Sequence, residues 1–301
     1  MSKKLALTGL PLVLLLSACG GSDPFEEGGD AEGGEGGDAI VVGSADFPES
    51  TLLAEVYGRA LEAEGVPVDY QLNIGSREVY YDQIEAGALS LFPEYNGAIL
   101  AYLDDEAPSA DSEETNTLLE EALPEGLEIL ASSEAENKDS VTVTREIADE
   151  YDLAALPDLA DVADELVLGG PPEFETRQQG VMGLESVYGV EFGEFRSLEV
   201  ALLTKALTDD DIQAANLFTT DPQIVEEGFV VLEDPENLFG AQNVTPLINS
   251  EQVDETARGI IDEVSGTLTT EELTELNKRI VVDNENAADV AQEWLREQGL
   301  A

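Results

Sequence analysis

Seven short segments of the chain combine aromatic residues, arginine, asparagine and glycine. These are the residue types that a polar ligand cleft uses, and the segments follow apolar runs typical of β-strands. Taken singly, each segment is also explained by ordinary turn chemistry, because glycine, proline and asparagine make turns. The segments are 44–50 (SADFPES), 75–81 (GSREVYY), 93–98 (PEYNGA), 136–140 (ENKDS), 169–178 (GGPPEFETRQ), 219–222 (TTDP) and 239–246 (FGAQNVTP).

The composition narrows what such a cleft could do. The 301 residues include 66 Asp and Glu against 13 Lys and Arg, with no histidine and one cysteine. The net charge of −53 excludes a nucleic-acid-binding protein, which needs a basic face. Without histidine there is no His-based acid–base catalysis, no Ser-His-Asp or Cys-His nucleophile and no His-ligated metal. One cysteine excludes an intrachain disulfide and a Cys-cluster metal site, and no calcium-loop spacing occurs. We expect no enzyme, no cofactor and no metal.

The first 39 residues are predicted to direct the protein to the membrane for export and to tether it there. Lys3 and Lys4 precede an apolar stretch, 5–16, of the length of a secretory signal and too short to span a bilayer as a helix. The sequence LSACG at 16–20 resembles the bacterial lipobox and predicts a signal peptide 1–18 and a lipidated Cys19; the alternative is an ordinary signal that happens to carry a cysteine. Residues 19–39 then form a flexible acidic, glycine-rich tether at the outer face of the cytoplasmic membrane.

Acidic residues are spread over the whole chain rather than clustered. Carboxylates at this density repel one another unless counterions screen them. We interpret the acidity as adaptation to high external salt, so the protein is expected to be halophilic. An acidic secreted protein without such adaptation, or a protein with cation sites, is the alternative. The acidic runs 104–114 and 209–211 are predicted to be solvated surface.

Strand-like and helix-like runs alternate along the rest of the chain. This alternation predicts an α/β fold with mostly parallel strands that bind ligands at their carboxyl ends. The length suits one large domain or two lobes of roughly 100–150 residues. Strands are predicted at 40–43, 66–74, 89–92, 127–130, 141–144, 166–168, 229–232 and 245–248. Helices are predicted at 51–64, 80–86, 198–207, 252–265, 270–283 and 286–298.

The order and spacing of the strand-end segments resemble those of the substrate-binding proteins of osmoprotectant ABC importers. These are the glycine betaine, choline and carnitine receptors of the ProX and OpuBC type. The resemblance runs from about residue 41 to the C-terminus, and its most specific parts are PEYNG at 93–97 and VVLEDP at 230–235. It implies a two-lobed, type II periplasmic-binding-protein-like fold with two crossover strands. Lobe 1 would hold 40–132 plus 240–301, and lobe 2 would hold 133–239.

The resemblance also implies a binding site. In that family a cage of tyrosines surrounds a quaternary ammonium, which aromatic faces attract, and an arginine takes the carboxylate. Tyr95 matches a cage tyrosine, and Phe218 stands where another is usual. Ser140 and Gln242 stand where the family has aromatic residues, and Arg177 matches the arginine. The other residues implied to bind ligand are Asn96, Asn137, Asn243, Phe47, Ser76 and Asp221.

Further residues affect the composition of the implied ligand site and its aromatic cage. Ala45 and Ala98 replace a lysine and a threonine that some family members use for the carboxylate. Replacement walls of the cage could come from Phe47, Tyr80, Tyr81 or Phe174, although helix-face packing also explains Tyr80 and Tyr81. Gln242 and Asn243 indicate a pocket more polar than the usual betaine cage.

The resemblance implies an extracytoplasmic receptor, acting as a monomer, that captures a small osmolyte and delivers it to an ABC permease with a cytoplasmic ATPase. The lobes would close on the ligand by a hinge motion. One alternative keeps this role for a different small polar amine or amino acid, which the altered cage favours. A hydrolase with the carboxylate pair Glu49 and Glu94, and a structural surface lipoprotein, are the others.

Overall fold

The computed structural model describes residues 39–108 and 110–301. The predicted signal peptide 1–18, the predicted lipidation site Cys19 and all of the predicted tether except residue 39 lie outside the described residues. Within the described part of the chain, none of the helices combines the length and the apolarity needed to cross a bilayer.

The first of two five-stranded sheets defines lobe 1, and its strand order is β2-β1-β3-β10-β4. Its strands are β1 (Ile40–Gly43), β2 (Val68–Gln71), β3 (Leu91–Tyr95), β4 (Leu127–Ile129) and β10 (Val244–Asn249). Buried apolar side chains form a cluster on each face, so the sheet is covered on both sides. One face packs against α1 (Pro48–Ala63), α9 (Glu255–Thr267), α10 (Thr270–Val281) and α11 (Ala287–Gln298). The other packs against α2 (Arg77–Glu85), α3 (Asn96–Leu103) and α4 (Ser112–Ala122).

The second sheet defines lobe 2, with the order β7-β6-β8-β5-β9. Its strands are β5 (Asp139–Val143), β6 (Val167–Gly170), β7 (Glu194–Ser197), β8 (Ala214–Phe218) and β9 (Val230–Val231). Its helices are α5 (Arg145–Tyr151), α6 (Val181–Tyr188), α7 (Val200–Thr208) and α8 (Pro222–Glu227), with short 3₁₀ turns at Leu156–Asp161, Ala163–Glu165 and Pro172–Glu175. Two apolar clusters again lie on its two faces.

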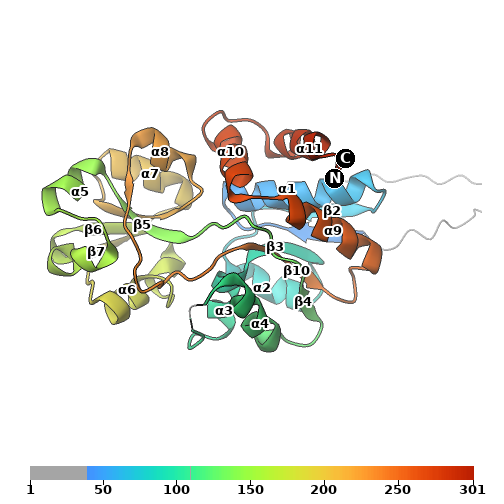
Figure 1. Ribbon diagram of the computed structural model, residues 1–301, viewed down its shortest axis with the longest axis horizontal. Helices are drawn as coiled ribbons and strands as arrows, with labels where there is room; N and C mark the ends of the chain where they lie inside the picture. Colours follow the sequence, from blue (N-terminus) through green and yellow to red (C-terminus); the bar gives the residue numbers. More distant parts are fainter. Residues whose placement is uncertain (1–38, 109) are drawn as a thin grey trace, which may run out of the picture. The chain divides into compact units, whose positions relative to one another are not determined.

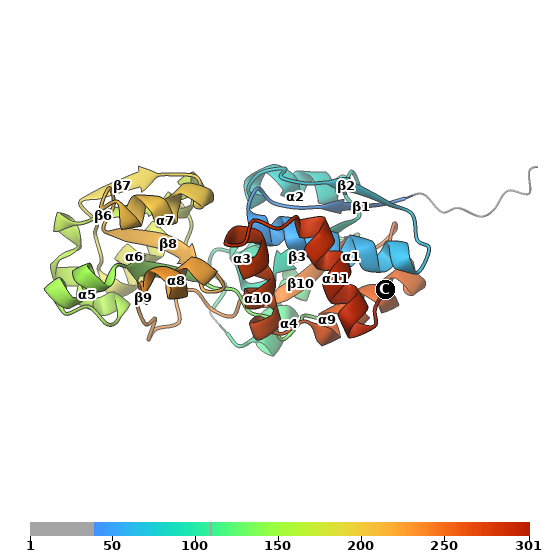
Figure 2. The ribbon, with the colours of Figure 1, turned by 90° about the horizontal axis from the view of Figure 1, so that it is seen from above.

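The chain crosses between the sheets twice, after β4 and before β10, and Figures 1 and 2 show the two crossings close together. They pair antiparallel: the amide of Asn137 donates to the carbonyl of Gln242, and the amide of Val244 donates to that of Ala135, both at 2.9 Å. The expected α/β fold with two lobes and two crossover strands is therefore confirmed.

The prediction of mostly parallel strands is confirmed, since four of the five strands in each sheet run in the same direction; one strand per sheet is reversed, so both sheets are mixed. β1 pairs with β2 and β3 in parallel, and β6 pairs with β7 and β8 in parallel. β10 runs antiparallel to β3 and β4, and β5 runs antiparallel to β8 and β9. β5 and β10 are the first strands that the chain forms after each crossing. The chain enters the sheet there from the end opposite to that of the other strands, so these two strands run in the reverse direction.

Candidate functional site

Three aromatic rings from the two lobes lie in a row beside strand ends. Tyr95 is the last residue of β3, Phe218 is the last residue of β8, and Phe47 is the N-cap of α1. The Phe47 ring is the middle one, with its centroid 6.4 Å from that of Tyr95 and 5.2 Å from that of Phe218. Pro48, at the first helical position, fixes where α1 starts and hence where Phe47 stands.

Cavities lie on both sides of this row. On one side, two adjoining cavities of about 70 and 250 Å³ share Arg77, Ala98, Asp139 and Arg177 in their linings; we call them the arginine chamber. On the other side is a cavity of about 300 Å³, which we call the carboxylate chamber. Its polar lining residues are Glu49, Asn137, Thr220, Asp221, Gln223 and Asn277. Phe47 and Phe218 line both chambers, so this aromatic pair separates them.

Glu49 is the centre of the polar contacts between the lobes, although it is only 5% exposed. Its carboxylate accepts hydrogen bonds from the Tyr95 hydroxyl (2.5 Å), the Asn137 amide (2.6 Å), the Thr220 hydroxyl (2.5 Å) and the Asn277 amide. We call these five residues the Glu49 cluster. Among the described residues Glu49 has no ion-pair partner, so its charge is held by neutral donors alone.

The pKa values of two neighbouring groups reflect this arrangement. Burial, assisted by the Glu49 carboxylate, raises the pKa of the Tyr95 hydroxyl well above its ordinary value, so this hydroxyl stays protonated and donates. Burial raises the pKa of Asp221, which lines the same chamber, and the Glu49 charge adds to the effect. The Asp221 carboxylate also caps α8 by accepting from the amide of Gln223 at 2.9 Å, which opposes the shift.

In the arginine chamber, Arg77 and Glu94 form a buried, two-pronged ion pair. Nε and Nη2 of Arg77 each donate to one Glu94 oxygen at 2.8 Å. Glu94 also accepts from the Tyr80 hydroxyl at 2.6 Å and from the Tyr95 amide at 3.0 Å. Burial alone would lower the pKa of Arg77, but the Glu94 charge outweighs it and the pKa is raised, so the guanidinium stays charged. The carboxylates of the hydrolase alternative, Glu49 and Glu94, are thus both engaged in bonds within the protein.

A second arginine of this chamber joins the lobes. Arg177 of lobe 2 donates from Nε and Nη2 to the carboxylate of Glu78 on α2, at 3.0–3.1 Å. Burial works to raise the pKa of Glu78, but the Ser76 hydroxyl and the Arg177 charge outweigh it, and the pKa is lowered. Ser76 is the N-cap of α2 and lines the chamber as well.

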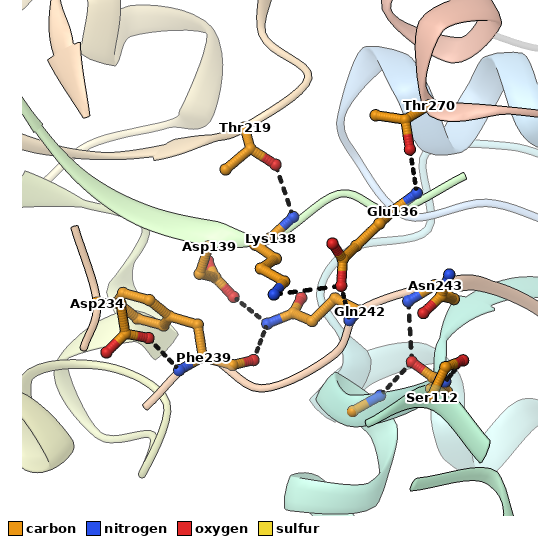
Figure 3. A network of polar contacts seen from close by, with 12 residues as sticks. Ser112, Glu136, Lys138, Asp139, Thr219, Asp234, Phe239, Gln242, Asn243 and Thr270 are labelled. Carbon is orange, nitrogen blue, oxygen red and sulfur yellow. Dashed lines mark hydrogen bonds and ion pairs between the residues drawn. The ribbon is translucent and has the colours of Figure 1, made fainter. Parts of the chain in front are cut away.

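Two polar side chains, Asp139 and Gln242, line the arginine chamber near the positions 140 and 242 at which the resemblance implies cage walls. Asp139 lies at the start of β5 and lines the chamber. The Gln242 amide donates to the Asp139 carboxylate at 3.3 Å and to the carbonyl of Phe239 at 3.1 Å, as Figure 3 shows. The cleft thus offers a carboxylate and an amide beside the Phe218 ring.

Of the predicted ligand-binding residues, the structure brings most to the two chambers. They are Phe47, Ser76, Tyr95, Asn137, Arg177, Phe218, Asp221 and Gln242, and their contact with a ligand stays a prediction. Phe174 and Tyr80, two of the replacement walls considered, line the arginine chamber. Tyr80 also stacks on Phe92 at 3.7 Å between centroids, and Tyr81 is buried in the same apolar cluster, as helix-face packing predicts.

Asn96, Ser140 and Asn243 line neither chamber, and their contact with a ligand also stays a prediction. Asn96 is fully buried, and its side chain bonds Ser112, Asn116 and the amide of Asn243. Asn243 turns its amide to the carbonyl of Ser133. Strand alternation turns Ser140 inward to the carbonyl of Leu217 at 2.7 Å, so its neighbour Asp139 takes the place in the cleft.

Sequence reasoning missed Thr220, Asn277 and Arg77 as members of the site, and it named Glu49 only as a carboxylate of the hydrolase alternative. Thr220 and Arg77 lie inside the strand-end segments TTDP and GSREVYY, and Glu49 lies inside SADFPES, so the segments contained the signal. Asn277 lies in α10, and no local sequence pattern marks it as a member of the site. Within the described residues, no group of three or more Cys, Asp or Glu side chains is arranged to hold a metal ion.

Two α/β lobes joined by two crossings, with aromatic and charged side chains facing each other between them, define a substrate-binding protein of the type II periplasmic class. The family described as the substrate-binding domain of ABC-type glycine betaine transport systems matches residues 38–297, and the chain belongs to this family. The expected family is confirmed, and it is a family of transport receptors rather than of enzymes.

Relatives and solved structures agree with this assignment. The glycine betaine-binding protein YehZ of Escherichia coli (strain K12) is 25% identical over 276 residues, covering 86% of this chain and 90% of that protein. The glycine-betaine-binding protein of Pseudomonas aeruginosa is 24% identical over 279 residues, covering 87% and 89%. The crystal structure of a glycine betaine/carnitine/choline ABC transporter protein is similar in fold, with a TM-score of 0.69, 22% identity and coverage of 87% and 99%.

Proposed function

We propose that this protein is the extracytoplasmic receptor of an ABC importer and captures a compatible solute of the glycine betaine or choline type between its lobes. The observation that carries the proposal is the row of Tyr95, Phe47 and Phe218, which places aromatic faces from both lobes beside one cleft. Such faces attract a trimethylammonium group by about 0.5–2 kcal/mol each. The relatives support the same class of solute, since they are described as glycine betaine-binding proteins.

A second solute class is favoured by one specific observation. Asp139 and Gln242 put hydrogen-bond acceptors beside the Phe218 ring. A quaternary ammonium has no N–H group to donate to them, whereas a less methylated amine or an amino acid does. The alternative is therefore the same receptor role for an ammonium compound that keeps N–H donors.

The receptor would act as a monomer, with lobe 1 at 40–132 plus 240–301 and lobe 2 at 133–239, and would dock in its closed form on a permease driven by a cytoplasmic ATPase. Cleavage after residue 18 and lipidation of Cys19 would anchor it to the outer face of the membrane, and the acidic surface would suit high external salt. Replacing Cys19 with Ser should release the protein into the medium; retention on the membrane would contradict the anchor.

Thermal unfolding with added solutes tests the proposed function. In molar salt, glycine betaine, choline, carnitine, proline and glycine are compared; a ligand at 100 times its Kd adds about 2.7 kcal/mol. We expect a shift with a methylated ammonium compound, reduced in Phe218→Ala and kept in Phe218→Tyr, which retains the ring. A shift only with proline or glycine would support the N–H-bearing class instead. No shift with any of the five would contradict both.

A further inference from the structure

The carboxylate chamber is a second cavity, for which the implied solute cage does not account. Tyr95, Arg177 and Gln242 line the arginine chamber, on the other side of the aromatic pair. The carboxylate chamber, of about 300 Å³, is lined by α1 and α10 of lobe 1 and by α7 and the β8–α8 connection of lobe 2. Small-molecule sites measure about 300–1,000 Å³, so this volume suits a small organic ligand.

Most residues that line the carboxylate chamber are apolar. Phe47 and Phe218 line it together with aliphatic side chains from both lobes, among them Val200, Ile280 and Val281. A metal ion such as Ca²⁺ prefers a cage of oxygen ligands, and within the described residues no group of three or more Cys, Asp or Glu side chains is arranged to hold one. The chamber therefore suits an organic group, whose apolar surface is stabilised when it leaves water.

The charged part of the chamber wall is negative. Glu49 and Asp221 contribute carboxylates, and neither a lysine nor an arginine occurs among the described residues that line the chamber. The Glu49 carboxylate already accepts four hydrogen bonds, so its charge acts on the chamber while both its oxygens are engaged. Because apolar walls screen charge less than water does, the two carboxylates favour a cation in the chamber.

Asp221 is the carboxylate that can bond a ligand directly. Its Oδ1 accepts from the amide of Gln223 at 2.9 Å and so caps α8. Its Oδ2 has no hydrogen-bond or ion-pair partner among the described residues. Oδ2 is also not among the fully enclosed polar atoms that lack a partner, so a ligand in the chamber can donate to it.

A second acceptor of the chamber residues lacks a donor. Asn277 lines the chamber and is 3% exposed, and its Nδ2 donates to Glu49 and to the hydroxyl of Thr220. Its Oδ1 has no hydrogen-bond partner. Buried polar atoms are normally paired, so both Asp221 and Asn277 indicate that the chamber is short of donors rather than of acceptors.

We infer that the carboxylate chamber is a second ligand site, which binds a small organic monocation that combines N–H donors with an apolar group, such as a primary aralkylamine. Its ammonium group donates to Oδ2 of Asp221, and its apolar part packs against Phe47, Phe218 and the aliphatic side chains of the wall. This site is separate from the proposed solute site, and the inference does not depend on which solute the arginine chamber takes.

Calorimetric titration of the purified protein in molar KCl tests the site with three ligands that share a benzyl group. Benzylamine carries a charged ammonium with N–H donors, benzyltrimethylammonium carries the charge without the donors, and benzyl alcohol carries no charge. We expect benzylamine to bind about tenfold or more tighter than either of the others. Asp221→Asn, which keeps the cap of α8, should weaken benzylamine by about tenfold and benzyl alcohol by less than about threefold.

Further variants locate the binding of benzylamine. Asp139→Asn changes the carboxylate of the arginine chamber in the same way, and it should weaken benzylamine by less than about threefold. Ala201→Phe adds a ring at an exposed position of the carboxylate chamber, and it should weaken all three benzyl ligands because it takes up part of the cavity. Ala63→Phe is its control, at an exposed position of α1 that lines neither chamber, and it should change no affinity.

Several results would overturn the inference. Absence of benzylamine binding would remove the site, and equal affinities for benzylamine and benzyl alcohol would show that charge is not recognised. Benzyltrimethylammonium bound as tightly as benzylamine would show that the N–H donors play no part. A larger loss of benzylamine affinity in Asp139→Asn than in Asp221→Asn would place the amine in the arginine chamber instead.

Discussion

The carboxylate of Glu49, in the first turn of α1, accepts a hydrogen bond of 2.5 Å from the hydroxyl of Thr220, which lies after β8 in the other lobe. The same carboxylate is bonded to Asn137 on the first crossing and to Asn277 on α10. One buried charge therefore ties together both lobes and a crossing. Because the partners of Glu49 belong to both lobes, its carboxylate contributes to holding the lobes together.

Replacing Glu49 with Gln should weaken both folding and ligand binding. An amide has one acceptor oxygen where the carboxylate has two, and its NH₂ group faces other donors, so some donors of the Glu49 cluster lose their partner. Each unsatisfied buried group costs about 1–3 kcal/mol. We expect a lower thermal midpoint and an affinity for the solute lowered by roughly tenfold or more, measured by calorimetry.

Glu55→Gln is the matched control, because Glu55 is a second nearly buried glutamate on α1 and pairs with Arg59 rather than with lobe 2. It should leave the affinity unchanged. Equal loss of affinity in Glu49→Gln and Glu55→Gln would mean that Glu49 has no special role between the lobes.

Gly97, in the PEYNG segment, is predicted to tolerate no side chain. A Cβ at this position would lie 2.1 Å from the carbonyl oxygen of Ala241 on the second crossing. Gly97→Ala must therefore push α3 away from that crossing, at a cost of about 1–3 kcal/mol. Gly259→Ala, inside α9 with no atom near the added methyl group, should instead stabilise the protein by about 0.5–1 kcal/mol. Urea unfolding measures both, and a neutral Gly97→Ala would refute the close approach.

The sequence predicted the parts of the fold that depend on local periodicity. The strand 40–43 and the helices near 51–64, 270–283 and 286–298 agree with β1, α1, α10 and α11 within a few residues, because their apolar spacing is regular. β8 and α3 were missed, since their runs are short and bordered by the segments interpreted as loops. The direction of β5 and β10 depends on where the chain crosses, which no local pattern records.

For the site, the sequence predicted which segments take part more accurately than which individual side chains do. The resemblance implies that Ser140 binds ligand, but its neighbour Asp139 lines the cleft. Neighbouring residues of a strand point to opposite faces, so a shift of one residue moves a side chain to the other face. Glu49 is one of 66 acidic residues, and only the approach of residues distant in sequence, such as Thr220 and Asn277 at 171 and 228 positions away, distinguishes it from a surface acid.

Asp221 should make stability depend on pH in a definite direction. Its pKa is raised in the folded state by burial and by Glu49, so the folded protein holds this proton more tightly than the unfolded chain. Stability is therefore lost as the pH rises from the ordinary value of 3.8 through the raised pKa, and the loss stays constant above it.

Asp221→Asn should remove this loss while keeping a cap for α8, since Asn caps helices as well as Asp does. We expect the variant to gain stability relative to the natural protein between pH 4 and pH 7 in urea unfolding. Asp254→Asn, at the exposed N-cap of α9, is the control for replacing a capping carboxylate. A stability difference for Asp221→Asn that does not change with pH would contradict the assignment.

Added salt should continue to stabilise the protein at concentrations above those that are sufficient for the stability of ordinary proteins. The net charge is −53, and the acidic runs contain exposed carboxylates such as Asp104, Asp105 and Asp210, whose repulsion acts against the folded state. Because the Debye length falls from about 10 Å at 0.1 M to about 3 Å at 1 M, added salt weakens that repulsion. We expect the thermal midpoint to rise with KCl from about 0.1 M into the molar range. Replacing the exposed Glu113, Glu120 and Glu121 of α4 with Gln should reduce the rise, and a midpoint independent of salt would contradict salt adaptation.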